Sequence, residues 1–229
     1  MIRHPPVTDA GAHHDDSKPR LRELVPCSFV SGGALVVLYV GLNPRNHALL
    51  EQGYAFFQPE TRLDAWVPLW TPMVWPYYMY FPLIASALFL ESRRRQWLYE
   101  GVIGYVGVAF LGFCSFLFFP SRMNQPDLHA CGTAACKALQ AMYDLDQGFH
   151  VFPSMHVAIS VYTALFWRAR APRFWHVPGL LALAITASTV LCKRHYLLDI
   201  PAGIMVALAV RPLAVAAGPR VARLMRWAA

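Results

Sequence analysis

The sequence predicts an all-α fold, a six-transmembrane-helix bundle. Three observations carry this prediction: of the 229 residues only 14% are charged, 56% are hydrophobic, and long stretches contain no charge at all. A soluble domain usually carries about a quarter charged residues. The deficit indicates that lipid surrounds much of the protein surface.

The uncharged stretches place the helices. A membrane helix needs about 20 mostly apolar residues. Five stretches reach this length: residues 24–44, 65–90, 101–121, 147–167 and 174–192. A sixth begins at Ile200 and is interrupted by Arg211, a residue type that can extend its charged end toward a membrane interface. A soluble helical bundle is the competing interpretation, and the number and length of the stretches disfavour it.

The first stretch could also be a secretory signal, but its charged leader is long and no small-residue cleavage pattern follows it. We therefore predict three segments: a disordered cytoplasmic tail (1–23), the six-helix transmembrane catalytic domain (24–217) and a basic cytoplasmic tail (218–229). A His13–Asp16 cluster in the first tail could bind a metal, but a solvated tail is the simpler interpretation.

Basic residues predict the orientation. If six helices alternate, most Arg and Lys residues fall on the side that holds both termini. The positive-inside rule then places the termini in the cytoplasm, and we expect an inner (cell) membrane protein. The sequence pI near 9.4 needs no nucleic acid to explain it, because basic loops beside anionic lipid suffice.

Aromatic and cysteine residues predict further features of the outer face. An interfacial aromatic belt is expected from Trp66, Trp70, Trp75, Tyr77, Tyr78 and Tyr80. Cys131 and Cys136 lie in an outer loop, where a disulfide could persist. The sequence leaves open whether they are bonded.

Helix alternation also brings distant polar residues to the extracytoplasmic end, where we expect the active site. These residues are Arg122, Ser154, His156, Lys193, Arg194, His195 and Asp199. Pro153 suits the first position of a helix, whose free N–H groups form an anion site. His195 and Asp199 are four residues apart, so the carboxylate can hold one imidazole nitrogen and leave the other free to attack.

The remaining residues of this group suit phosphoryl chemistry. His156 could protonate a leaving oxygen, and Lys193, Arg194 and Arg122 would neutralise a phosphoryl group in transfer. Among these residues we predict Ser154, Lys193 and Arg122 as substrate-binding. A zinc site from His156, His195 and Asp199 is the alternative, but the cations would repel a metal. No cofactor is predicted.

Two motifs of this group resemble those of the type-2 phosphatidic acid phosphatase superfamily. The segment FPSMHVA resembles its PSxH signature, and STVLCKRHYLLD resembles its later signature, with Ser, His and then Asp. The resemblance implies a phosphohistidine on His195, orientation of that residue by Asp199, protonation of the leaving group by His156, and phosphate binding by Ser154. It covers roughly residues 64–203.

The resemblance has two departures. The KxxxxxxRP signature of the superfamily is absent, and Thr189 stands where an arginine usually follows the serine of the later signature. The HYLLD ending and the segment LDAWVPLWTPMVWPYYMYFP are more similar to the branch that contains inositol phosphorylceramide synthase and bacterial relatives. That branch includes both phosphotransferases and hydrolases.

The leading hypothesis is therefore an integral-membrane lipid phosphatase or phosphotransferase that acts on a lipid phosphate or phospholipid. One alternative is a non-catalytic protein that binds or transports lipid phosphates. A second is an intramembrane serine protease, although Ser154 lacks the Gly-x-Ser-x-Gly setting and the neighbouring cations suit an anion better than a peptide. The sequence does not indicate an oligomeric state.

Overall fold

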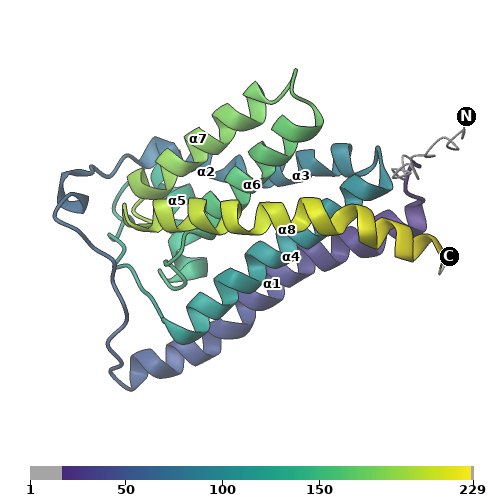
Figure 1. The fold of residues 1–229 in the computed structure, drawn as a ribbon. Helices are drawn as coiled ribbons and strands as arrows, with labels where there is room; N and C mark the ends of the chain where they lie inside the picture. The colour runs from purple at the N-terminus through teal and green to yellow at the C-terminus, as the bar shows by residue number, and fades with distance from the viewer. Residues whose placement is uncertain (1–16, 228–229) are drawn as a thin grey trace, which may run out of the picture.

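The computed structural model describes residues 17–227, except for the side chains of residues 34–40, 146 and 226–227. The His13–Asp16 cluster and most of the expected N-terminal tail lie outside the described residues. The described chain is all helical in its regular structure (Figure 1). Its elements are α1 (Leu21–Glu51), η1 (Asp64–Trp66), η2 (Thr71–Met73), α2 (Val74–Tyr78), α3 (Tyr80–Glu91), α4 (Arg95–Phe118), α5 (Ala134–Asp146), α6 (Met155–Arg170), α7 (His176–Leu191) and α8 (Asp199–Trp227).

Three helical stretches of the described chain are long and apolar enough to cross a membrane. They are Thr71–Glu91, Arg95–Phe118 and Asp199–Met225, and α7 is a shorter apolar helix. Large apolar side chains are exposed on the outer surfaces of α4, α7 and α8, among them Phe110, Val177, Leu180, Leu183, Met205, Leu208 and Leu213. This distribution is typical of helices that face lipid, so the protein is a membrane protein.

The fourth predicted helix begins later than the sequence pattern indicated. Gln147 ends α5 in a left-handed conformation, and α6 starts only at Met155. Its 16 residues span about 24 Å at 1.5 Å per residue, against a hydrocarbon core of about 30 Å. The uncharged residues 147–154 form a loop and a helix cap, and for this reason the lack of charge overestimated the helix.

Helix α5 was not predicted from the sequence. It carries Lys137, Asp144 and further polar residues, so no uncharged stretch marks it. Thr133 caps its first turn by accepting a hydrogen bond from the N–H of Cys136, and a disulfide joins Cys131 to Cys136. The structure thus contains the bond that the sequence left open. The apolar face of α5, with Leu139 and Met142, packs on Val74 and Tyr77 of α2.

The arrangement of the helices brings their connections together at two opposite ends. In Figure 1, α1 begins and α8 ends at the right, and the loops 52–70, 119–133 and 192–198 lie at the left beside α5. Helix α4 packs along α8 and α1, and α6 packs against α3, α7 and α8. Glu23, near the start of α1, pairs with Arg95 at the start of α4, and Glu100 of α4 pairs with Arg170 at the end of α6.

Close helix packing depends on glycines of α4. A Cβ atom on Gly104 would lie 1.8 Å from the hydroxyl oxygen of Tyr162, and one on Gly112 would lie 2.3 Å from the sulfur of Met155. Tyr162 is buried and donates a hydrogen bond of 2.9 Å to the carbonyl of Glu100. Neighbouring Tyr105 is 2.9 Å from the hydroxyl of Thr163. These contacts fix α6 against α4.

We predict that Gly104→Ala destabilises the protein by about 1–3 kcal/mol, because the added methyl group displaces the buried ring of Tyr162. Gly32→Ala is the matched control, since no atom lies within 4 Å of its added Cβ and alanine favours a helix. Thermal unfolding in detergent measures both variants. Equal stability of the two would contradict the packing argument.

Candidate active site

The 192–198 loop between α7 and α8 carries His195. After Leu191 the chain turns back sharply, and Lys193 adopts a left-handed conformation with φ of 48°. The N–H groups of Arg194 and His195 both donate to the carbonyl oxygen of Thr189, at 2.9 and 3.1 Å. This turn places His195 inside the protein, where its side chain is 5% exposed.

The Nδ1 atom of His195 lies between two acceptors. The carbonyl oxygen of Val151 is 2.9 Å away, and the carboxylate oxygen Oδ2 of Asp199 is 3.2 Å away. A carbonyl oxygen can only accept, so Nδ1 carries the proton. The neutral ring then has its lone pair on Nε2. Burial, with the nearby charge of Arg194, lowers the pKa of His195 to about 3, which keeps the imidazole neutral.

Asp199 begins α8 and is fully buried. Its Oδ2 also accepts the N–H of Tyr196, at 2.7 Å. Its main-chain carbonyl accepts the N–H of Ser154, at 3.2 Å, and this bond ties the start of α8 to the start of α6. The structure therefore places Asp199 as the predicted partner of His195.

His156 faces His195 from α6. The two ring centroids are 5.9 Å apart, with an angle of 59° between the ring planes. Tyr77 and Tyr80 pack against His156 with centroid distances of 4.5 Å each, and the hydroxyl of Tyr77 is 3.4 Å from Nδ1 of His156. Both tyrosines are buried, so the expectation that they belong to an interfacial belt is wrong. Trp66, Trp70 and Trp75 are exposed.

Ser154 caps the start of α6. Its Oγ accepts the N–H of Val157 at 3.3 Å, and its side chain is fully buried. Because Ser154 is the capping residue, Pro153 precedes the cap and does not occupy the first helical position, which corrects the expectation from the sequence. The hydroxyl hydrogen of Ser154 can still donate to a phosphoryl oxygen.

The three predicted cations occupy different places. The ammonium group of Lys193 is 2.6 Å from the carbonyl oxygen of Val67 and 3.2 Å from that of Asp64. The guanidinium of Arg122 lies 5.7 Å from the ring centre of Phe149. Neither contact is with His156 or His195.

Arg194 is the predicted cation whose charge acts on His195, its neighbour in the chain. It is 4% exposed, it stands 6.0 Å over the ring of Tyr143, and its charge acts on His195 and on the hydroxyl of Tyr77. With the amide of Gln125 oriented so that its oxygen faces the guanidinium, Gln125 accepts a hydrogen bond from Arg194. Sequence reasoning grouped Arg194 with the other cations but did not select it as a substrate-binding residue. Its position next to His195 was the available signal.

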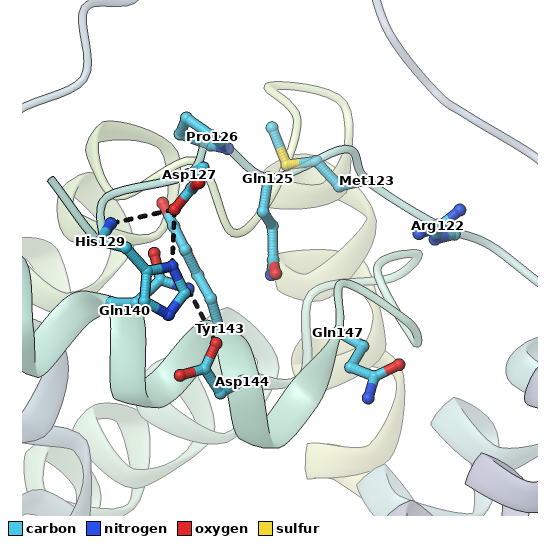
Figure 2. A pocket seen from close by; sticks show the side chains of 10 residues that line it. All are labelled: Arg122, Met123, Gln125, Pro126, Asp127, His129, Gln140, Tyr143, Asp144 and Gln147. Atoms are coloured by element: carbon cyan, nitrogen blue, oxygen red, sulfur yellow. Dashed lines mark hydrogen bonds and ion pairs between the residues drawn. The ribbon is translucent and has the colours of Figure 1, made fainter.

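A polar cavity of about 550 Å³ lies between the 122–129 loop and α5 (Figure 2). Asp127 bonds His129 at 2.7 Å, and Gln140 bonds Asp144 at 2.8 Å. Tyr143 lines the cavity and donates a 2.5 Å hydrogen bond to the carbonyl of Cys192. The cavity thus borders the 192–198 loop, whereas its lining does not include His156 or His195. Arg122 stands at its edge, away from Asp127 and His129 (Figure 2).

The zinc alternative gains no support from this geometry. Among the residues that the structure describes, no group of three His, Cys, Asp or Glu side chains is arranged to hold a metal ion. The cluster instead offers two imidazoles, a buried carboxylate, a hydroxyl and a cation. These groups can act together on a phosphoryl centre by nucleophilic attack, proton transfer and charge stabilisation.

Comparison with known proteins gives one match. The model of a protein family described as the PAP2 superfamily matches residues 55–213. A search of curated proteins and a search of solved structures each found no significant match. The family match spans Ser154, His156, His195 and Asp199 and covers well over half of the sequence, so the chain belongs to the PAP2 superfamily, the phosphatase superfamily that its two motifs resemble.

Proposed function

We propose that the protein is an integral-membrane lipid phosphatase or phosphotransferase that works through a phosphohistidine on His195. One observation carries the proposal: Nδ1 of His195 is held by Val151 and Asp199, so the lone pair of the neutral ring is on Nε2. Membership of the PAP2 superfamily supports phosphatase or phosphotransferase activity in general.

The reaction has two halves. In the first, Nε2 of His195 attacks phosphorus, the bond from phosphorus to the leaving oxygen breaks, and protonated His156 gives that oxygen its proton. Asp199 stabilises the positive charge that develops on the ring of His195. In the second half, water or an alcohol gives a proton to His156 and attacks phosphorus, and the bond to Nε2 breaks.

The charge of the transferred group needs donors that do not have to reorganise. The hydroxyl of Ser154 and the first free N–H groups of α6 supply hydrogen bonds, with the positive end of the helix dipole behind them. Arg194 supplies a full charge from the loop that carries His195. Arg194 therefore replaces Lys193 and Arg122 as the side chain that neutralises the phosphoryl charge, since both of these have contacts elsewhere.

The substrate class follows from the membrane setting. We propose a lipid phosphate or phospholipid that reaches the histidines at the extracytoplasmic end, with both termini in the cytoplasm. Support comes from Figure 1, where α1 begins and α8 ends at the same end of the molecule. It also comes from the arginines in the segments that helix alternation places on the side of the termini, which include Arg22, Arg93, Arg94, Arg168, Arg173, Arg220 and Arg223. The similarity to the inositol phosphorylceramide synthase branch is part of this proposal. A panel of lipid phosphates and phospholipids, assayed with and without an alcohol, identifies the substrate and the acceptor.

We predict that His195→Ala abolishes phosphate release and transfer and leaves the fold intact, because no other group supplies the nucleophile. In the wild-type protein, acid quenching during turnover of labelled substrate should trap label on histidine. His176→Ala is the matched control, an exposed histidine at the start of α7 on the opposite side of the membrane in the proposed topology. Turnover by His195→Ala, or label on serine, would contradict the nucleophile assignment.

We predict that the loss of rate in His156→Gln depends strongly on the leaving group. Loss of the general acid should slow release of an alcohol by about 10²–10⁴-fold, since its oxygen needs a proton. A nitrophenyl phosphate ester needs none, so the rate of phosphoenzyme formation from it should change little. Stopped-flow release of nitrophenolate measures that step. An equal loss on both substrates would contradict the role of His156, and His129→Gln serves as the control for loss of an outer histidine.

A further inference from the structure

Three hydrogen bonds to the turn formed by residues 61–67 hold the chain on the two sides of His195. Before His195, the ammonium group of Lys193 donates to the carbonyl oxygens of Asp64 and Val67, at 3.2 and 2.6 Å. After His195, the N–H of Leu197 donates to Oδ1 of Asp64, at 2.8 Å. The 192–198 loop and the 61–67 turn are far apart in sequence, so these contacts are tertiary.

The carboxylate of Asp64 is itself held firmly. Its Oδ2 accepts the N–H of Thr61 at 2.8 Å and the hydroxyl of Thr61 at 2.7 Å. Burial raises the pKa of Asp64, but the hydrogen bonds from Thr61 and Leu197, with the charge of Lys193, outweigh it and lower the pKa below its usual value. The carboxylate is therefore ionised when it accepts the N–H of Leu197.

The loop needs such an anchor because of its conformation. Lys193 has a positive φ, which non-glycine residues adopt only when the surrounding structure holds them there. On the inner side, the carbonyl of Thr189 holds the N–H groups of Arg194 and His195. On the outer side, Lys193 and Leu197 hold the loop through their hydrogen bonds to the 61–67 turn. Together, the contacts on the two sides fix the position of His195 relative to the end of α7.

We propose that the 61–67 turn positions His195 for phosphoryl transfer, with Asp64 and Lys193 as positioning residues. Lys193 then acts on the loop and does not contact the transferred phosphate. This inference rests on the proposed function, because the effect of a displaced imidazole is seen in the reaction that it performs. A misplacement of about 1 Å at a reacting atom can lower a rate by about 10²-fold without a change in binding.

The test compares Lys193→Met, Asp64→Ala and the double variant in the full-length protein in detergent. The kcat of each single variant should fall by about 10–100-fold. The KM and the inhibition constant of inorganic phosphate should stay within about threefold, because the phosphate-binding groups remain. The double variant should be no slower than the slower single variant, since both substitutions release the same loop. Lys193→Arg keeps donors for the two carbonyls and should recover much of the kcat.

Matched controls come from the same segment. Arg62→Met removes an exposed cation, and Glu60→Gln removes an exposed carboxylate, and both should turn over at the wild-type rate. If Asp64→Ala fails to fold, Asp64→Asn provides the measurement, because its amide keeps the shape and puts a donor against Thr61 or Leu197. Size-exclusion profiles identify the folded variants.

Two results would overturn the inference. One is a Lys193→Met variant with normal kcat and an inhibition constant for inorganic phosphate raised by about tenfold or more, which indicates direct phosphate contact. The other is wild-type kinetics in Lys193→Met and the Asp64 variant. His195→Ala separates the two proposals: if it is inactive while the loop variants are normal, only the positioning role fails. If His195→Ala turns over normally, the proposed function itself fails.

Discussion

The hydrogen bonds at Nδ1 of His195 are the constraint on which the rest of the site depends. They join the 192–198 loop and the adjoining start of α8, at Asp199, to the loop before α6, at Val151, which is distant in sequence. A buried carboxylate is costly unless donors surround it, and hydrogen bonds to charged groups contribute about 1.5–3 kcal/mol each. The ring N–H of His195 and the N–H of Tyr196 serve Asp199 in this way. Both bonds go to Oδ2, while Oδ1 is buried without a hydrogen-bond partner among the described residues, and the bond from His195 also selects the tautomer of its ring.

The contacts of Asp199 also connect the start of α8 to the start of α6. Ser154 gives its own N–H to the carbonyl of Asp199 and uses its Oγ to cap α6. The closeness of α6 and α8 follows from Gly203, where a Cβ would lie 2.5 Å from the carbonyl oxygen of Ser154. At the far end of the bundle, Gly104 and Tyr162 set α6 against α4. Small residues at helix contacts thus carry the geometry of the site, as is usual where lipid gives no hydrophobic drive for helix association.

The sequence predicted the parts of the fold that depend on long apolar stretches and on short motifs. The family, the helical class, and the meeting of His156, His195 and Asp199 follow from patterns that are local in sequence or repeat along a helix. The number of membrane spans and the orientation stay predictions, because three described stretches meet the length and hydropathy of a span. Helix α5 was missed because its polar face interrupts any apolar run.

Other parts of the site had no signal in the residue types. A main-chain carbonyl such as that of Val151 is present at every position, so its role depends on the path of the loop alone. Tyr77 and Tyr80 match the composition of an interfacial belt as well as that of a histidine pocket. From its residue type and position in the sequence, Lys193 is a candidate phosphate ligand. Only the structure shows that its ammonium group contacts the carbonyl oxygens of Val67 and Asp64.

The structure also bears on the choice between water and an alcohol as acceptor. In the proposed mechanism the chemistry at Nε2 of His195 is the same for both, so the choice depends on which molecule reaches the phosphohistidine. Tyr143 and Gln125 line the polar cavity (Figure 2), each also contacts Arg194, and both come from segments outside the sequence motifs. In the proposed reaction the motifs supply the groups that act at phosphorus, and the choice of acceptor would depend on segments outside them, of which α5 and the 122–129 loop line the polar cavity.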